Sequence, residues 1–233
     1  MRIIMATDFY PPFLGGVELQ SQNLSRELAR RGDEVSLITV WRPGLLTRQR
    51  DAGVEIYRLK GLFTAAPWFS TVPGRRYHPP FPDPLIALRL RRLVRSWHPD
   101  VVHTTGWISY SCALALLGLK TPLVLSARDF SNVCAVRTLL RDGRICDGPE
   151  LAKCIRCASR SYGIPKALAA VVGVRSGGPL LRHKTAATHS ISSYVEQVMQ
   201  RCFWTDGSRL PAALRVTIPD TLVPGSVAGV DRR

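Results

Sequence analysis

The chain has 233 residues, of which 45% are hydrophobic and 21% charged, a balance typical of a globular protein that argues against disorder. This length can bury a full core, so we expect one α/β domain. The formal net charge of +15 is unusual. It indicates either a polyanionic partner (an anionic membrane surface, nucleic acid or a phosphorylated substrate) or only a genome that encodes arginine where lysine would serve.

The sequence predicts neither a membrane-spanning helix nor a signal peptide. No apolar run approaches the roughly 20 residues that a spanning helix needs. Asp8 ends the first apolar run too early for a signal peptide. We therefore expect a cytoplasmic location, with peripheral contact at the inner membrane face as a further expectation, and we expect no structural disulfides.

The first forty residues predict a strand, a loop, a helix and a second strand. Residues 2–7 and 33–40 are apolar runs, residues 17–31 have the spacing of an amphipathic helix, and the loop between them ends in Gly15 and Gly16. A βαβ unit of this kind predicts a parallel sheet. Glycines at the start of a helix expose backbone N–H groups where phosphate binds, although a plain tight turn would use the same pair.

The alternation continues along the chain and predicts a doubly wound, mostly parallel, Rossmann-like α/β sheet. The long aromatic-rich stretch at 60–84 is expected to be functional or mobile. The arginine-rich helix after it would lie on an anionic membrane or, as we favour, pack on the sheet with a solvated basic face. We expect further strands at 54–59, 100–104, 122–127, 184–191 and 214–218, and helices at 84–97, 107–117, 161–174 and 192–202.

Four cysteines lie within two dozen residues, in the pattern C-x11-C-x7-C-x2-C: Cys134, Cys146, Cys154 and Cys157. In a cytoplasmic protein this clustering favours a structural zinc site in a region with little apolar content of its own. Disulfides, free thiols or an iron–sulfur cluster remain alternatives. All four ligands would be thiolates, so no position would be open for catalysis. Cys112 and Cys202 stand apart in apolar helices and are expected to be core residues.

The sequence of the first forty residues resembles the N-terminal sequence of family-4 glycosyltransferases, which are retaining enzymes of the GT-B fold. In that family a strand ends in a Y-P-P-x-x-G-G loop before a helix ending L-x-x-R-G-H-x-V; Asp33 stands here where the histidine is usual. Four later segments also resemble strand ends of the family, so the resemblance runs from Met1 to about Asp220. These segments are HPDVVHTTG, TPLVLSARDF, ATHSISSYVEQ and VTIPD.

The resemblance implies transfer of a hexose from a UDP- or GDP-sugar to a glycan or lipid-linked acceptor, without a catalytic metal, in cell-surface polysaccharide or glycolipid synthesis. Gly15 and Gly16 would contact the donor diphosphate. His103 would lie near the acceptor pocket, or be structural. Arg128 replaces the histidine that usually precedes Asp129, so it would stabilise charge instead of moving a proton. The alternative is that Arg128 and Asp129 form a surface ion pair.

The resemblance also implies that residues 1–220 form the acceptor-side N-terminal domain, with a Cys-rich insertion at about 131–160 and a linker or disordered tail at 221–233. The C-terminal nucleotide-sugar domain would be missing, and a separately encoded polypeptide could supply it. Without that domain we expect little catalysis, because transfer places two substrates together across a cleft. Two alternatives remain. The chain could be a basic module that is stabilised by zinc and binds nucleic acid, or it could be a degenerate, regulatory half-enzyme.

Overall fold

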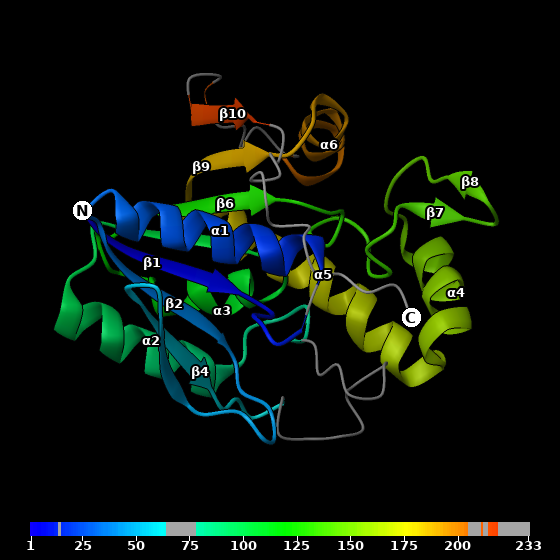
Figure 1. Cartoon of the computed structure of the whole chain (residues 1–233). Helices are drawn as coiled ribbons and strands as arrows, with labels where there is room; N and C mark the ends of the chain where they lie inside the picture. Colours follow the sequence, from blue (N-terminus) through cyan, green and yellow to red (C-terminus); the bar gives the residue numbers. More distant parts are fainter. Residues whose placement is uncertain (14, 64–77, 205–210, 212–213, 219–233) are drawn as a thin grey trace, which may run out of the picture.

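The computed structural model describes residues 1–13, 15–63, 78–204, 211 and 214–218, and it places a mostly parallel sheet at the centre (Figure 1). The strand order is β10-β9-β6-β5-β1-β2-β4-β3. Every pair in this sheet is parallel except the β3–β4 pair at one edge. The strands are β1 Arg2–Thr7, β2 Glu34–Val40, β3 Arg48–Asp51, β4 Val54–Leu59, β5 Val101–Thr105, β6 Leu123–Ala127, β9 Thr185–Ser190 and β10 Arg215–Thr217.

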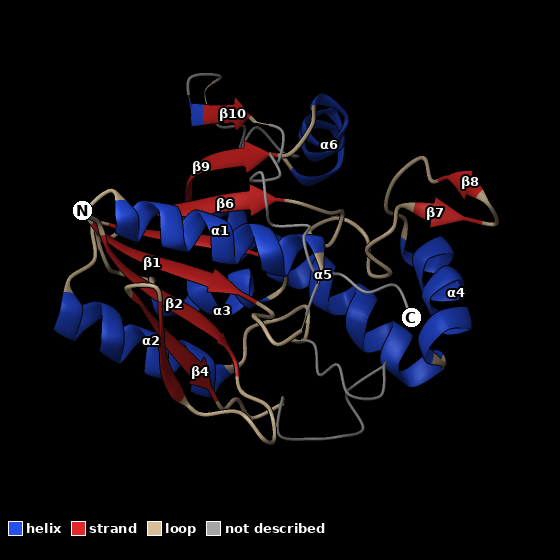
Figure 2. Ribbon diagram, in the orientation of Figure 1, coloured by secondary structure: helices blue, strands red, loops and turns tan. Residues whose placement is uncertain are grey.

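Helices cover both faces of this sheet (Figure 2). Successive side chains of β1 point to opposite faces, as strand geometry requires. Ile3 and Met5 join a core cluster against which Leu24 and Leu28 of α1 pack. Ile4 belongs to the larger cluster on the other face, which contains residues of α2 and α3. The predicted doubly wound α/β fold is therefore confirmed. The helices are α1 Gly16–Arg30, α2 Pro84–Trp97, α3 Ile108–Ala115, α4 Leu151–Tyr162, α5 Ile164–Lys184 and α6 Ser193–Val198, followed by a π-helix at Met199–Phe203.

The helix predicted at 161–174 exists as the first half of α5, but its bounds are wrong. Two helices occupy this region, and Gly163, with φ of +75°, separates α4 from α5. α5 then continues through Gly173, Gly177 and Pro179, which a sequence reading takes as helix breakers. A Cβ atom on Gly177 would lie 2.6 Å from the ring of buried Tyr110. Close packing against α3 thus requires the glycine and outweighs its low helix propensity.

Other differences concern short elements and boundaries. The edge strand β3 and a hairpin of β7 (Leu140–Arg141) and β8 (Arg144–Ile145) were not expected. The strands predicted at 184–191 and 214–218 and the helices at 107–117 and 192–202 exist but are shorter, with the π-helix replacing the end of the last one. Most of the stretch at 60–84 and the tail at 221–233 lie outside the described residues.

The basic helix α2 packs through Ile86, Leu90 and Val94, as the favoured reading predicted. Its Arg91 donates from Nη1 to the carbonyl oxygens of Ala115 (2.8 Å) and Leu117 (2.6 Å), at the end of α3. This arginine therefore satisfies helix-end carbonyls. Among the helices that the structure describes, none is long and apolar enough to cross a membrane.

Residues 130–162, called the cysteine segment below, leave the sheet after β6. They contain the β7–β8 hairpin and α4, which lie at the right of Figure 1, beyond the ends of the strands. α5 leads from this segment back to the sheet (Figure 1). The segment packs against α5 through a small cluster of buried alanine and valine side chains, four of which come from α5.

Candidate functional site

A cavity of about 320 Å³ opens at the carboxyl ends of β1 and β5. Ligands of doubly wound sheets bind at this edge. Four parts of the chain line it: the end of β1, the first turn of α1, the connection from β5 to α3, and the cysteine segment with the residue before it. The lining residues are Thr7, Asp8, Phe9, Val17, Glu18, Thr105, Gly106, Trp107, Asp129, Val136, Arg137 and Tyr162.

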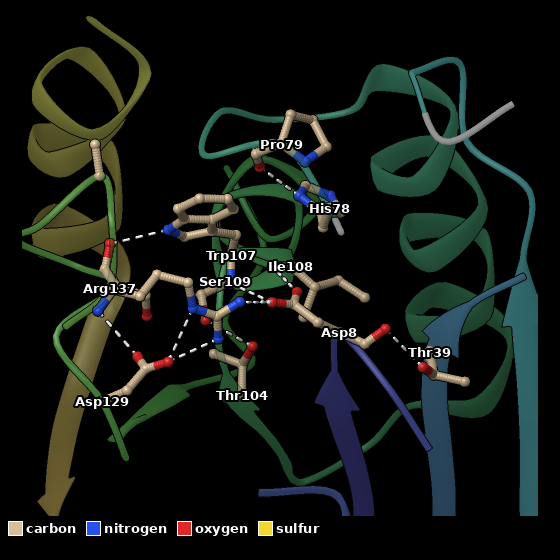
Figure 3. Close-up of polar contacts among 12 residues, drawn as sticks. Asp8, Thr39, His78, Pro79, Thr104, Trp107, Ile108, Ser109, Asp129 and Arg137 are labelled. Carbon is tan, nitrogen blue, oxygen red and sulfur yellow. Dashed lines mark hydrogen bonds and ion pairs between the residues drawn. The ribbon is translucent and has the colours of Figure 1, made fainter. Parts of the chain in front are cut away.

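Asp8, directly after β1, is buried at the centre of this site. Its carboxylate accepts hydrogen bonds from the backbone N–H groups of Trp107 (3.0 Å) and Ile108 (2.8 Å), at the start of α3 (Figure 3). The positive end of the helix dipole also stabilises this charge. Burial nevertheless raises the pKa of Asp8, and the guanidinium of Arg137 opposes that shift.

Gly106 permits this approach between Asp8 and α3. Its φ is +79°, a conformation that residues with a side chain rarely adopt, and a Cβ atom there would lie 2.5 Å from Oδ2 of Asp8. Two independent requirements, backbone conformation and space, thus fix glycine at this position.

Arg137 joins the two carboxylates of the cavity (Figure 3). Its Nη1 lies 3.5 Å from Oδ2 of Asp8, while Nε and Nη2 donate to Oδ2 of Asp129 at 2.9 and 2.7 Å. The guanidinium carbon lies 5.2 Å from the centroid of the Trp107 ring, and the indole N–H donates to the carbonyl oxygen of Ser131. One ionic and aromatic cluster therefore holds the cysteine segment against the ends of β1 and β5.

The loop after β1 is held firmly on its other side. The Arg42 guanidinium carbon lies 4.1 Å from the Phe9 ring centroid and 4.0 Å from that of Phe13. Tyr10 donates its hydroxyl to Asp51 at 2.6 Å. These contacts fix Phe9 and Asp8 before any ligand binds, which reduces the ordering cost of binding.

The predicted glycines lie at the start of α1. Gly15 precedes the first turn in an extended conformation with φ of −155°, and Gly16 is the first helical residue. A Cβ atom on Gly16 would meet nothing within 4 Å. The residues of this turn that line the cavity are Val17 and Glu18, so phosphate contact by the glycine pair stays a prediction.

Of the other residues predicted from the sequence, Asp129 lines the cavity, whereas His103 and Arg128 do not. The ion pair of Asp129 is with Arg137. His103 is partly buried on β5, and burial, followed by Arg128 and His189, lowers its pKa to about 3. His103 is therefore neutral near pH 7. Arg128 is buried at the end of β6, where its charge acts on His103.

Sequence reasoning missed Asp8, Trp107, Arg137 and Tyr162. Asp8 carried a usable signal, because a carboxylate that directly follows an apolar first strand lies at the ligand-binding edge. Gly106-Trp107 carried another, since a glycine between strand and helix marks a special turn. Arg137 and Tyr162 had none, because they reach the cavity through the tertiary fold of the cysteine segment.

The four clustered cysteines line a second, small cavity of about 20 Å³. All are free thiols in the structure, and burial raises the pKa of Cys154 and of Cys157. Within the described part of the chain, no group of three or more His, Cys, Asp or Glu side chains is arranged to hold a metal ion. The zinc site thus stays a prediction. Cys112 is fully buried, as expected of a core residue, and Cys202 is partly buried in the π-helix.

The parallel sheet with a cavity at the carboxyl ends of its strands defines a Rossmann-like α/β protein. Residues 14–139, more than half of the chain, match the model of Glycosyltransferase Family 4. The chain belongs to that family, which confirms the resemblance found in the sequence.

Solved structures show the same fold. A sucrose-phosphate synthase from Thermosynechococcus elongatus is 12% identical over 94% of this chain and 48% of its own, with a TM-score of 0.56. A second structure of that enzyme is 11% identical over 94% of this chain and 88% of its own, with a TM-score of 0.53. The chain thus spans about half the length of the first. A comparison with curated proteins gives no match.

Proposed function

We propose that this chain forms the acceptor-binding half of a nucleotide-sugar-dependent, retaining glycosyltransferase. It would transfer a hexose to a glycan or lipid-linked acceptor in cell-surface polysaccharide or glycolipid synthesis. The observation that carries the proposal is the cavity at the carboxyl ends of the strands, where carboxylates and aromatic rings meet in a chain of family 4. Pockets with apolar walls and a few convergent polar groups suit a ligand that must be oriented.

The acceptor sugar would lie between aromatic side chains and carboxylates. Phe9, Trp107 and Tyr162 offer apolar ring faces in the cavity. Asp129 is the carboxylate within reach of a ligand hydroxyl, because its side chain is 27% exposed and that of Asp8 only 4%. Arg137 would keep Asp129 oriented through their ion pair. Asp8 would act as a positioning residue that holds Arg137 and the start of α3.

In the reaction, the acceptor oxygen forms a bond to the anomeric carbon while the bond from that carbon to the diphosphate breaks. The nucleoside diphosphate leaves, and the proton of the attacking hydroxyl passes to the phosphate oxygen freed when that bond breaks. Gly15 and Gly16 would bind the donor diphosphate at the positive end of α1, where the open space at Gly16 lets an anion approach the backbone. Arg128 would add positive charge behind this edge of the sheet, and His103, being neutral, would serve the acceptor side as a hydrogen-bonding group.

We assign the four clustered cysteines to structure, as ligands of a zinc ion that takes no part in transfer. The enzyme would work in the cytoplasm, with its positive charge favouring contact with anionic lipid. Remaining contacts to the donor would come from a second domain, since the matched sucrose-phosphate synthase is about twice as long as this chain.

Donor binding can be tested by thermal unfolding with UDP-sugars, GDP-sugars, and uridine or guanosine as phosphate-free controls. We expect a sugar nucleotide of one base to raise Tm, and Gly16→Ala to reduce the shift without changing Tm of the free protein. Gly178→Ala, a remote change with only a flexible arginine tip nearby, is the matched control. Salt-dependent binding of generic RNA, with no response to any sugar nucleotide, would contradict the proposal and favour a nucleic-acid module.

Acceptor binding needs a second assay. We expect hexose transfer to a lipid or glycan extract of the source cells, by this chain with its second domain, to fall about 100-fold or more in Asp129→Asn. Arg95→Met, at a solvent-exposed position of α2, should leave the rate unchanged. Equal rates in both variants would remove Asp129 from the reaction.

A further inference from the structure

The cysteine segment brings four thiols from three local structures to one place. Cys134 lies in the loop after β6, Cys146 follows β8, and Cys154 and Cys157 lie on α4. The last two are three residues apart, so they share one face of the helix. All four line the small cavity of about 20 Å³. A void of roughly 10–15 Å³ already holds one water molecule, so a single ion fits here.

The surroundings of this cavity suit a negatively charged centre. A zinc ion bound by four thiolates carries a net charge of about −2. Two cationic side chains, Arg141 and Lys153, also line the cavity. Lys153 is paired with Asp147, whose carboxylate also accepts a hydrogen bond from Sγ of Cys146 at 3.7 Å. The backbone N–H of Glu150 donates to Sγ of Cys154 at 3.4 Å. Both charge and N–H donation would stabilise thiolates.

The segment has only a small apolar core around α4, although Val133 and Leu139 near its start are buried in the main core. The cluster beside α4 contains four alanines and two valines, of which four residues come from α5. The hairpin exposes Leu140 by 52% and Ile145 by 67%, so its two-residue strands bury little apolar surface. Small units of this kind usually depend on a disulfide or a metal.

The backbone around Cys134 is hydrogen-bonded to two residues that line the cavity at the end of the strands. The carbonyl oxygen of Cys134 accepts a hydrogen bond from the backbone N–H of Arg137 at 3.0 Å. Tyr162, at the end of α4, donates its hydroxyl to the carbonyl oxygen of Ala135 at 3.3 Å. Arg137 and Tyr162 line the cavity, as does Val136 between them and the thiols. A crosslink among the cysteines would therefore fix one wall of the site.

We propose that Cys134, Cys146, Cys154 and Cys157 bind one zinc ion, and that this ion holds Arg137 in its contact with Asp8 and Asp129. In the described structure the thiols share a cavity without yet forming a coordination shell. Binding of the ion would require the cysteine side chains to rotate about χ1, which moves each sulfur between staggered positions. The metal site does not depend on the transferase activity, whereas its effect on the acceptor side rests on the proposed function.

The first test is the metal content of the full chain, purified without chelator under reducing conditions. We expect about one equivalent of zinc, four protected thiols, and a large loss of zinc in Cys154→Ser. Cys202→Ser, outside the cluster, should keep its zinc. Folded wild-type protein without metal would overturn the zinc site, as would two disulfides or the visible absorption of an iron–sulfur cluster.

The second test follows Arg137 through its neighbour Trp107 and needs no activity assay. The indole N–H signal of Trp107, assigned with Trp107→Phe, should shift when a chelator removes zinc from the wild-type chain and return when zinc is added back. Arg137→Met should give a signal that no longer responds to zinc. If zinc binds but the wild-type signal never moves, the link to the cavity is wrong although the metal site stands. Neither readout depends on transfer, so failure of the proposed function remains distinguishable.

Discussion

The two sides of the cavity are held in place by different means. The side formed by the end of β1 and the start of α3 is built into the main core, with Asp8, Trp107 and Ile108 all buried. The side formed by Val136, Arg137 and Tyr162 belongs to a segment with a thin alanine-rich cluster. The first side is stabilised by packing of the whole sheet, while the second depends on Arg137 and, as we propose, on a metal. Changes on the sheet side should therefore lower the free energy of unfolding most, and changes on the other side should lower it less while altering the site.

The largest effect is expected for Gly106→Ala. The positive φ and the overlap with the Asp8 carboxylate together should lower the free energy of unfolding by about 3 kcal/mol. Gly118→Ala is the matched control, because Gly118 also has a positive φ, of +70°, but has open space around it. It should cost about 1 kcal/mol. Urea unfolding of both variants measures the difference. Equal losses would show that the approach of Asp8 to α3 contributes nothing.

Arg137→Met should have the next largest effect and should separate the two sides. Asp8 loses its cation, so its pKa should rise further, and the unfolding free energy should fall by about 2 kcal/mol. Carboxyl NMR titration and urea unfolding would record these changes. Arg30→Met, which removes an exposed pair with Glu27 on α1, should change neither. An unchanged titration of Asp8 would contradict the bridging role of Arg137.

The pH dependence of stability tests the environment of His103, on the strand that leads to the cavity. Its pKa is about 3 in the folded protein, below the unfolded value of about 6.5, so the unfolded chain binds a proton first as pH falls. His103 therefore does not lower the free energy of unfolding above about pH 6.5, and it lowers that free energy progressively as pH falls towards 3. His103→Gln should reduce the difference in unfolding free energy between about pH 7 and pH 4.5.

Two further histidines help to interpret that measurement. Burial also lowers the pKa of His78, so His103→Gln should not abolish the slope. The exposed His183→Gln is the control and should leave the slope unchanged. A slope that stays the same in His103→Gln would show that this histidine is solvated in solution.

The smallest effect is expected for Tyr10→Phe, at the outer anchor of the loop after β1. The change removes the hydrogen bond to Asp51 and should cost about 1 kcal/mol. Tyr194→Phe, an exposed tyrosine on α6, should be neutral in the same urea experiment. A loss as large as that of Gly106→Ala would mean that the loop is held chiefly from its outer side.

The centre of the sheet could be predicted from the sequence because β1 and β6 contain apolar runs, which are typical of buried parallel strands. Val101–Thr105 and Leu123–Ala127 lie within one residue or two of their expected ranges. The second half of α5 could not be predicted, because the helix there depends on the fit of Gly173 and Gly177 against Pro80 and Tyr110. Local propensity at those positions points the other way.

The site was predictable only in part for a similar reason. Asp129 follows a recognisable strand end, and the family pattern singled it out. The partners that give it a role are tertiary: Arg137 comes from the cysteine segment, and Asp8 at the end of β1 contacts the start of α3, which follows the neighbouring strand β5. No local pattern encodes such contacts, although each of the residues was visible in the chain.

The hydrogen bond between Asp8 and Ile108 has a consequence for folding. It joins residues 100 positions apart, so Asp8 is synthesised long before the amide that it accepts. Such contacts form slowly, because the entropy cost of closing a long loop comes before the stabilising contact is made. We therefore expect the cavity to assemble late, and the amides of Trp107 and Ile108 to gain protection from hydrogen exchange only after β5 has joined β1.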